Sequence, residues 1–209
     1  MIEYHTIIHS SKAPRKSCIA FEKIDGSNFR VKYTPKQGFC LYGTRTQLIN
    51  ETTPFWNEMV YEFKSNLEQS LLKLYKSREY SKYREIITFG EFYGDNSFAG
   101  FHKEEPHRIK IFDVLLGHKQ RHLLKPREFI KEIACIVDTP RVIYQGNLNE
   151  QLIEDVRNNL YDLNEGVVCK GNETSGSFFG NVWMCKIKTN EYIERVKNKF
   201  KEEEWEKYL

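Results

Sequence analysis

Apolar residues along the chain recur with two different periods. Short segments rich in β-branched and aromatic residues predict strands. They are residues 4–8, 17–22, 27–33, 39–43, 85–93, 109–116, 141–145, 165–170 and 182–188. Elsewhere apolar residues recur every three or four positions, which predicts amphipathic helices. These run from 54 to about 78, from 147 to 160, and onward from 190.

The ends of the first two helices carry their own signals. Thr53 is expected to cap the first helix, with Pro54 in its first turn. Asn147 and Glu150 form an Asn version of the capping box for the second helix, whose apolar face ends at Leu160. Helices inserted between clusters of antiparallel-looking strands predict an α+β fold.

Length and composition set limits on the class of protein. A chain of 209 residues, 40% of them hydrophobic, can bury one sizeable core, and we expect a single domain over residues 1–209. No stretch approaches the ~18 apolar residues that span a bilayer, and the N-terminus lacks a signal-peptide core. We expect an intracellular protein, cytoplasmic or nuclear, that is neither secreted nor bound to a membrane.

The cysteines and the net charge do not narrow the class of protein much further. The five cysteines are scattered without the spacing of a disulfide framework or a zinc site: Cys18, Cys40, Cys135, Cys169 and Cys185. A net charge of +3 does not demand nucleic acid. Residues 1–50 carry eight Lys or Arg and three Asp or Glu, so this part could attract phosphates or be a merely solvated basic face.

Lys23 lies in the segment Phe-Glu-Lys-Ile-Asp-Gly-Ser-Asn, residues 21–28. A lysine between Glu22 and Asp25 could simply form a surface ion pair. In a functional interpretation, the preceding strand delivers Lys23 to a pocket and Gly26 permits a tight turn. A free lysine is a poor nucleophile at neutral pH, so its pKa must be lowered by burial or by neighbouring cations.

Lys186 and Lys188 are the expected neighbouring cations. Their spacing of two places both ammonium groups on one face of a strand. Two such cations can hold a phosphate on which negative charge develops. Alternating lysines on an exposed edge strand are the simpler alternative.

Two carboxylates, an arginine and a phenylalanine are further candidate site residues. Glu165 lies at the start of a buried strand, where it is either a ligand for Mg²⁺ or part of an ordinary turn. Glu91 and Arg45 suit ribose hydroxyls and phosphate oxygens. Phe112 could stack on a base or lie in the core.

Taken in their order along the chain, these segments resemble the motifs of the covalent nucleotidyltransferases. This group includes ATP-dependent DNA ligases, RNA ligases and mRNA capping enzymes. The similarity covers residues 18 to 188 and is greatest to the RNA ligase 2 group. It implies an ATP-grasp-like ligase domain with antiparallel sheets and inserted helices. It also implies ATP as the nucleotide and Mg²⁺ as the metal, with Mn²⁺ as a substitute.

The resemblance also implies a role for each site residue. Lys23 accepts AMP, Lys186 and Lys188 hold the α-phosphate, and Glu165 binds the metal. The remaining residues contact the nucleotide or act in later steps: Glu91 at the ribose, Arg45 at a phosphate or sugar oxygen, Phe112 on the purine, Glu22 near the adenine, and Asn28 in the strand-dependent steps. Asp113 could hold the pocket or a metal, and its role is open.

A three-step sealing of RNA ends is therefore expected. Lys23 forms lysyl-AMP, AMP passes to a 5′-phosphate, and a 3′-OH displaces it. DNA or an RNA–DNA hybrid stays open as the substrate because the RNA ligase 2 group usually has His where this chain has Asp25. A guanylyltransferase and a noncatalytic nucleic-acid-binding protein are the alternatives.

The segment after Lys188 is short. Only 21 residues follow it, and no separate OB or helical domain is evident there. We expect a monomer that acts as a minimal ligase or relies on an accessory protein to bind its substrate.

Overall fold

The computed structural model describes residues 1–95, 104–172 and 181–205, which form two sheets. In spatial order, the first sheet contains β1 (Ile8–His9), β11 (Val182–Lys188), β10 (Gly166–Asn172), β2 (Ser17–Lys23) and β9 (Val142–Asn147). The second contains β5 (Leu48–Ile49), β4 (Gly38–Gly43), β3 (Ser27–Thr34), β6 (Glu85–Tyr93), β7 (Arg108–Gly117) and β8 (Arg121–Leu123). Neighbouring strands are antiparallel, except that β1 is parallel to β11.

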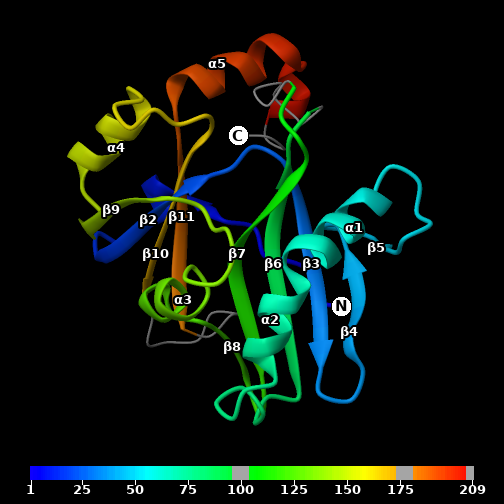
Figure 1. Cartoon of the computed structure of the whole chain (residues 1–209). Coiled ribbons are helices and arrows are strands. Elements are labelled where there is room, and N and C mark those ends of the chain that lie inside the picture. The colour runs from blue at the N-terminus through cyan, green and yellow to red at the C-terminus, as the bar shows by residue number, and fades with distance from the viewer. Residues whose placement is uncertain (96–103, 173–180, 206–209) are drawn as a thin grey trace.

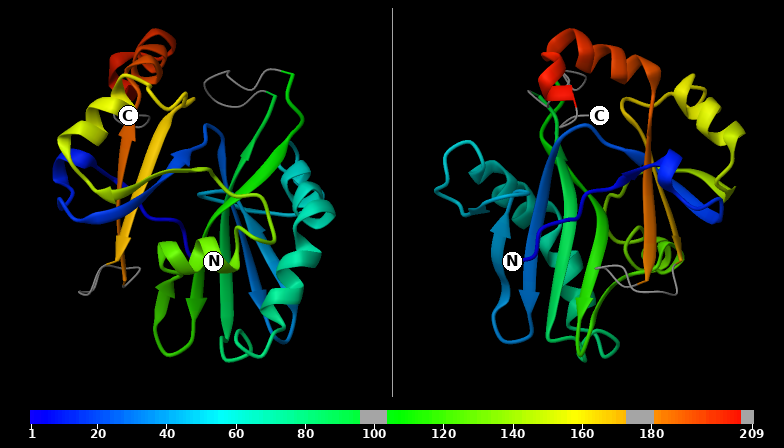
Figure 2. Two further views of the ribbon diagram at one scale, coloured as in Figure 1. Left: turned by 60° about the vertical axis from the view of Figure 1, so that its left-hand side comes forward. Right: turned by 180° about the vertical axis from the view of Figure 1, so that it is seen from behind.

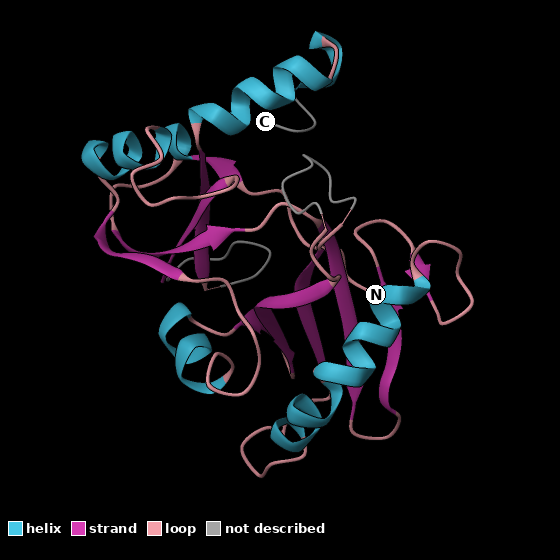
Figure 3. Ribbon diagram, turned by 45° about the horizontal axis from the view of Figure 1, so that its top comes forward, coloured by secondary structure: helices cyan, strands magenta, loops and turns pink. Residues whose placement is uncertain are grey.

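Five α-helices surround the sheets in the described part of the chain (Figure 1). They are α1 (Asn57–Asn66), α2 (Glu68–Tyr75), α3 (Pro126–Glu132), α4 (Glu150–Arg157) and α5 (Asn190–Lys199). Two short 3-10 turns are Ser10–Lys12 and Glu202–Glu204. Helices α1 and α2 cover the outer face of the second sheet and α4 covers the first (Figure 2, left). Helix α5 crosses the end of the first sheet at which β11 finishes (Figure 3).

The inner faces of the two sheets meet in a small apolar core. Phe89 and Leu115 of the second sheet pack with Val168 and Met184 of the first. Tyr4, from the segment before β1, is buried in the same cluster. This contact holds the sheets together. Polar residues lie at the strand ends beyond this core. No described helix is both long and apolar enough to span a membrane.

Most predicted strands are confirmed with small shifts at their ends. The strand predicted at 4–8 is wrong, because pairing begins only at Ile8 and Tyr4 serves instead as a core residue. The short strands β5 and β8 and the helix α3 were not predicted. Each is too short to show a clear period of its own.

The single helix predicted from 54 to 78 is also wrong. Helix α1 begins at Asn57, and the helical conformation is interrupted at Leu67 (φ −120°, ψ −32°) before α2 begins. Trp56, and not Thr53, precedes α1 as the N-cap residue. Phe55 has a φ of 66°, so Pro54 lies in a turn outside the helix. The apolar spacing persists across the break because both helices pack on the same sheet.

The second helix begins later than predicted. Asn149 is the N-cap, and its side-chain oxygen accepts a hydrogen bond from the Leu152 amide over 2.8 Å. Asn147 instead ends β9, so the proposed capping box does not form. The helix ends at Arg157, which leaves Leu160 68% exposed. The last helix is confirmed as α5.

Candidate active site

Three adjacent strands bring the predicted lysines and Glu165 to one end of the first sheet. Gly166 is the cross-strand neighbour of Lys23 on β2 and of Lys188 on β11. Gly166 has a φ of 151°, and a Cβ there would lie 2.0 Å from the Ile187 carbonyl oxygen. Only glycine therefore fits beside β11 at the point where Glu165 enters the sheet.

Glu165 forms a bridge between two lysines. Its Oε2 lies 2.8 Å from Nζ of Lys23, and its Oε1 lies 2.6 Å from Nζ of Lys188. The side chains of Glu165 and Lys188 are only 4% and 7% exposed, whereas that of Lys23 is 24% exposed. Lys23 is thus the member of this cluster that an incoming molecule can reach.

The pKa of Lys23 differs from the sequence-based expectation. Burial acts to lower this pKa, but the charges of Glu165 and Glu91 outweigh it and raise the pKa above its ordinary value. The expectation that Lys186 and Lys188 would lower the pKa of Lys23 is wrong for the unliganded site. Lys23 is held as an ammonium ion, paired with the Glu165 carboxylate.

The pKa values of Lys186 and Lys188 are lowered, in contrast to that of Lys23. Burial, together with the charges of Lys188 and Lys23, lowers the pKa of Lys186 to about 8. Burial also lowers the pKa of Lys188, although Glu165 opposes it. Burial acts to raise the pKa of Glu165, but Lys23 and Lys188 hold it below its usual range. The site therefore gathers three lysines around the ionised carboxylate of Glu165, with the charge of Asp25 also acting on Lys23, and its cations can meet an anion.

Residues of the second sheet form the facing wall. Asn28 on β3 and Glu91 on β6 are cross-strand partners. Burial raises the pKa of Glu91 to about 8, with Lys23 opposing and Glu165 adding to the shift. The Asn28 side-chain oxygen is buried and has no hydrogen-bond partner among the described residues. Arg45 is exposed near this wall, and its charge acts on both Glu91 and Lys186.

Asp113 belongs to a second cluster, inside the core between the sheets. Its Oδ1 lies 2.9 Å from Nζ of Lys170, and the Tyr4 hydroxyl donates a hydrogen bond to its Oδ2. Lys170 also donates to the Phe112 carbonyl oxygen over 2.7 Å. The half-buried Phe112 ring packs edge-on against Tyr4, with the ring centroids 5.0 Å apart. Asp113 thus ties the two sheets together.

Glu22 lies beside Lys23 but makes a different contact. Its carboxylate accepts hydrogen bonds from Nε and Nη2 of Arg141 over 2.8 and 3.1 Å. Both Glu22 and Lys23 line a cavity of about 380 Å³, together with Tyr93 and Lys110. The structure therefore places Glu22 at the entrance next to Lys23 and away from the Glu165 bridge.

One acidic residue of the site is buried and not at the surface, and one contact of the site was not predicted from the sequence. Asp25, which is 2% exposed, acts on the charge of Lys23. The Tyr192 ring on α5 lies 4.3 Å from Nζ of Lys188, and Arg195 donates to the Asn164 carbonyl oxygen over 2.8 Å. An aromatic residue and an arginine three positions apart, directly after the two lysines, were the available signal for this contact.

The residues present fit a divalent cation that is shared with a phosphate ligand. Mg²⁺ is usually held by one or two carboxylates plus substrate phosphates, with water completing the shell. Glu165 supplies such a carboxylate, and the unpartnered oxygen of Asn28 is a second oxygen donor on the facing wall. Among the described residues, no group of three His, Cys, Asp or Glu side chains forms a complete protein cage.

Solved structures show the same fold. An unliganded variant of the Naegleria gruberi RNA ligase has a TM-score of 0.71 at 17% identity, covering 95% of this chain and 59% of that one. A variant of the same enzyme with ATP and Mn has a TM-score of 0.69 at 16% identity, covering 95% and 58%. Its structure with PPi has a TM-score of 0.68 at 16% identity, covering 95% and 59%. The chain thus spans about three-fifths of these relatives.

The family assignment comes from the sequence itself. A search of the curated proteins finds no match. The family model described as RNA ligase matches residues 16–188, which include every site residue predicted above. The match covers most of the chain, and the chain therefore belongs to the RNA ligase family.

Proposed function

We propose that this protein is an ATP-dependent RNA ligase that joins a 3′-OH to a 5′-phosphate through a covalent lysyl-AMP. One observation carries the proposal. An accessible lysine, Lys23, shares a buried carboxylate with a second lysine, and a third lysine lies on the same strand face. Lys186 forms no salt bridge with the described residues, so its ammonium group is the cation that an anionic ligand would meet.

Lys23 is the nucleophile in the first step. Its Nζ bonds to the α-phosphorus of ATP as the bond from that phosphorus to the pyrophosphate oxygen breaks. Lys23 must first lose a proton, which the Glu165 pair opposes by raising its pKa. A ligand that draws the Glu165 carboxylate away from Lys23 therefore activates the nucleophile.

Lys186 and Lys188 hold the phosphate during this step. Their side chains lie on the face of β11 that is directed toward the second sheet, as does Met184 in the inter-sheet core. Two ammonium groups there offset the charge that develops on the transferred phosphate and on the leaving pyrophosphate. Glu165 and the aromatic face of Tyr192 fix Lys188 for this role.

Glu165 is the proposed metal ligand. When bound there, Mg²⁺ or Mn²⁺ would supply charge neutralisation for the phosphates. A Naegleria gruberi relative with ATP and Mn supports this assignment. The same cation would compete with Lys23 for the carboxylate.

Residues of the facing wall would orient the nucleoside. Glu91 accepts ribose hydroxyl hydrogen bonds once its own proton has left, and Arg45 holds a phosphate or sugar oxygen. Phe112 stacks on the purine, and Glu22 lies near the adenine. These two assignments require rearrangement, because Phe112 contacts Tyr4 and Glu22 pairs with Arg141 in the unliganded protein.

The remaining steps act on RNA. AMP passes from Lys23 to the 5′-phosphate, and the 3′-OH then attacks that phosphate and releases AMP. Asn28 is the proposed residue for these steps, since its buried side-chain oxygen has no partner among the described residues. Family membership favours RNA over DNA as the substrate.

The first step can be tested without RNA. The purified protein is incubated with Mg²⁺ and α-labelled ATP or α-labelled GTP, and the label that survives denaturation is counted. We expect label from ATP only, and none in Lys23→Ala. Lys110→Ala, which removes another lysine lining the same cavity, is the matched control and should label normally.

Each outcome of this test has a clear meaning. Label in Lys23→Ala at the wild-type level would remove Lys23 as the nucleophile. Label from GTP would favour capping chemistry over ligation. If ATP labels the protein, sealing of matched nicked RNA and DNA duplexes then identifies the strand that it joins.

A further inference from the structure

A basic cavity lies at the opposite end of the second sheet from Lys23. It has a volume of about 540 Å³, and four cationic side chains and one carboxylate line it. These charged residues are Lys32, Arg84, Lys119, Arg121 and Glu85. Ile2 and Leu115 provide an apolar floor. The cavity therefore carries a net formal charge of +3 from five side chains, as much as the whole chain.

The single carboxylate cannot neutralise this cavity. Glu85 pairs with Lys32 through Oε2 over 2.8 Å and with Arg121 through Oε1 over 2.7 Å, so both of its oxygens are engaged. The hydrogen bonds and charges of Lys32 and Arg121 hold the pKa of Glu85 below its usual value despite burial. Arg84 and Lys119 are exposed and form no side-chain ion pair with the described residues. Two cations are thus left to face a ligand.

The cavity shares a face with the active site. Residues of β3 alternate in direction, so Thr34, Lys32, Arg30 and Asn28 lie on the same side of the strand. Lys32 pairs in register with Ile87 and Asn28 with Glu91, which places Lys32 and Asn28 on the inner face of the second sheet. Figure 2 (right) shows this side of the molecule, with the N-terminal segment crossing it.

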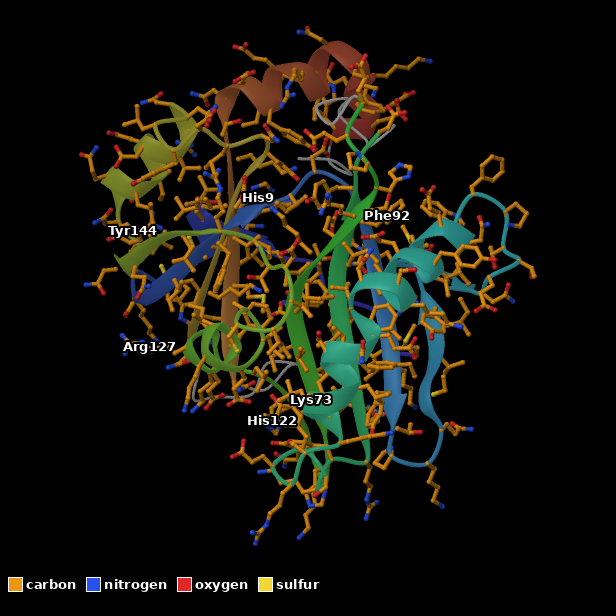
Figure 4. All side chains as sticks on the ribbon, in the orientation of Figure 1. His9, Lys73, Phe92, His122, Arg127 and Tyr144 are labelled. Carbon is orange, nitrogen blue, oxygen red and sulfur yellow. The ribbon has the colours of Figure 1, made fainter. Side chains whose placement is uncertain are left out.

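The distance between the two sites is set by β6. Glu85 lines the cavity and Glu91 lines the active site, six residues away on the same strand. At a rise of ~3.3 Å per residue, they are about 20 Å apart. In Figure 4, Phe92, which follows Glu91 on β6, lies in the upper half of the molecule, and His122, on β8, lies toward the lower end. Duplex DNA carries one phosphate per ~3.4 Å along each strand, and at a comparable spacing an RNA strand would span this distance in roughly six nucleotides.

We propose that this basic cavity binds the phosphate backbone of the RNA, roughly six nucleotides from the joined ends. This inference rests on the proposed ligase function and adds a separate contact for the substrate. A contact there is independent of sequence because it reads only phosphate charge. It also gives the protein a way to hold an RNA arm while the ends react at Lys23.

The test uses a charge reversal and a control on the opposite face. Arg84→Glu/Lys119→Glu reverses the two unpaired cations of the cavity. Lys73→Glu/Lys76→Glu makes the same change in net charge on and just after α2, at the same end of the molecule but on the outer face (Figure 4 labels Lys73). All four side chains are exposed, so neither variant should disturb the core.

Affinity is measured for nicked RNA duplexes whose arms are about four or about twelve base pairs long, at two salt concentrations. We expect the cavity variant to lose at least 10-fold in affinity for the long arms and little for the short ones. Its dependence of log K on log salt should be shallower by about two, one for each lost phosphate contact. The control should bind both duplexes like the wild type.

Two results would overturn the proposal. One is equal affinity of the cavity variant and the control for the long arms, and the other is an equal loss for long and short arms. If the cavity variant unfolds in circular dichroism, Lys119→Gln alone is measured, with an expected loss of about threefold for long arms. Lysyl-AMP formation needs no RNA and should be unchanged, so failure of the ligase proposal appears separately as no label in the wild type.

Discussion

This protein has two buried lysine–carboxylate clusters, one in the core between the sheets and one at the end of the first sheet, and they differ in charge balance. In the core, Lys170 and Asp113 are 5% and 3% exposed, and one cation meets one anion. At the strand end, Lys23 and Lys188 share Glu165, and Lys23 is 24% exposed. A buried ion pair alone is therefore no sign of a functional site. The excess of cations and the access to one of them distinguish the second cluster.

The largest expected effect comes from breaking the balanced cluster. Lys170→Met leaves Asp113 buried without its cation, which should cost about 3–5 kcal/mol of unfolding free energy. Lys23→Met should change stability by less than about 1 kcal/mol, because Glu165 keeps Lys188. Urea unfolding of both variants measures the difference. Equal losses would remove the distinction between the clusters.

A double variant sharpens this test. Lys170→Met/Asp113→Leu replaces the pair with apolar groups and should recover most of the lost stability. If it does not recover, the loss in Lys170→Met comes from packing against the Phe21, Phe112 and Phe129 rings, which surround the Lys170 ammonium at 5.2 to 5.8 Å.

Next in size is the removal of the shared carboxylate. Glu165→Gln should slow lysyl-AMP formation about 100-fold, which corresponds to ~2.7 kcal/mol, through loss of the metal ligand. The pKa of Lys23 should fall because the carboxylate that raises it is gone, so labelling should rise with pH over a lower range. Rates are measured against pH and Mg²⁺ concentration. An unchanged pH profile and metal dependence would exclude both roles.

Glu91 gives a smaller effect with a defined pH dependence. Burial raises its pKa from the ordinary 4.5 to about 8, so the folded protein keeps a proton that the unfolded chain releases. Stability from this group therefore falls as pH rises from about 4.5 to 8. Glu91→Gln should stabilise the protein by about 2 kcal/mol at pH 8 and by little at pH 5, while weakening ATP binding. Thermal unfolding at both pH values tests this expectation.

The smallest expected effect concerns the hydroxyl that completes the balanced cluster. Tyr4→Phe removes the hydrogen bond to Asp113 and should cost about 1 kcal/mol. Lysyl-AMP formation should be nearly unchanged, since Tyr4 supports the core. A loss of labelling without a loss of stability would instead place Tyr4 in the reaction.

Most strand positions were predictable from the sequence, and so was the common strand face of Lys186 and Lys188. The i, i+2 spacing of Lys186 and Lys188 fixed their common face because strand geometry is local. The pairing of Lys170 with Asp113 was not predictable, since it joins different sheets and depends on how they pack. The raised pKa of Lys23 was missed for the same reason, because the distance to Glu165 is a tertiary quantity.

Helix ends show where local patterns stop being informative. Thr53 and Asn147 both looked like caps, yet the helices begin at Asn57 and Glu150. The apolar period runs on through the break at Leu67 because α1 and α2 pack on one sheet, whereas Phe55, with a φ of 66°, is 92% exposed and lies outside that packing.

The glycine that begins β10 limits which substitutions this protein can tolerate. Gly166 has no room for a methyl group, whereas a Cβ at Gly38 would meet nothing within 4 Å. In a library carrying every amino acid at both positions, selection for folded protein should leave glycine almost alone at 166. At position 38, where φ is +69°, asparagine and aspartate should survive as well. Position 166, on the strand next to the nucleophile, should therefore accept almost no substitution, whereas position 38, in the hairpin between β3 and β4, should accept several.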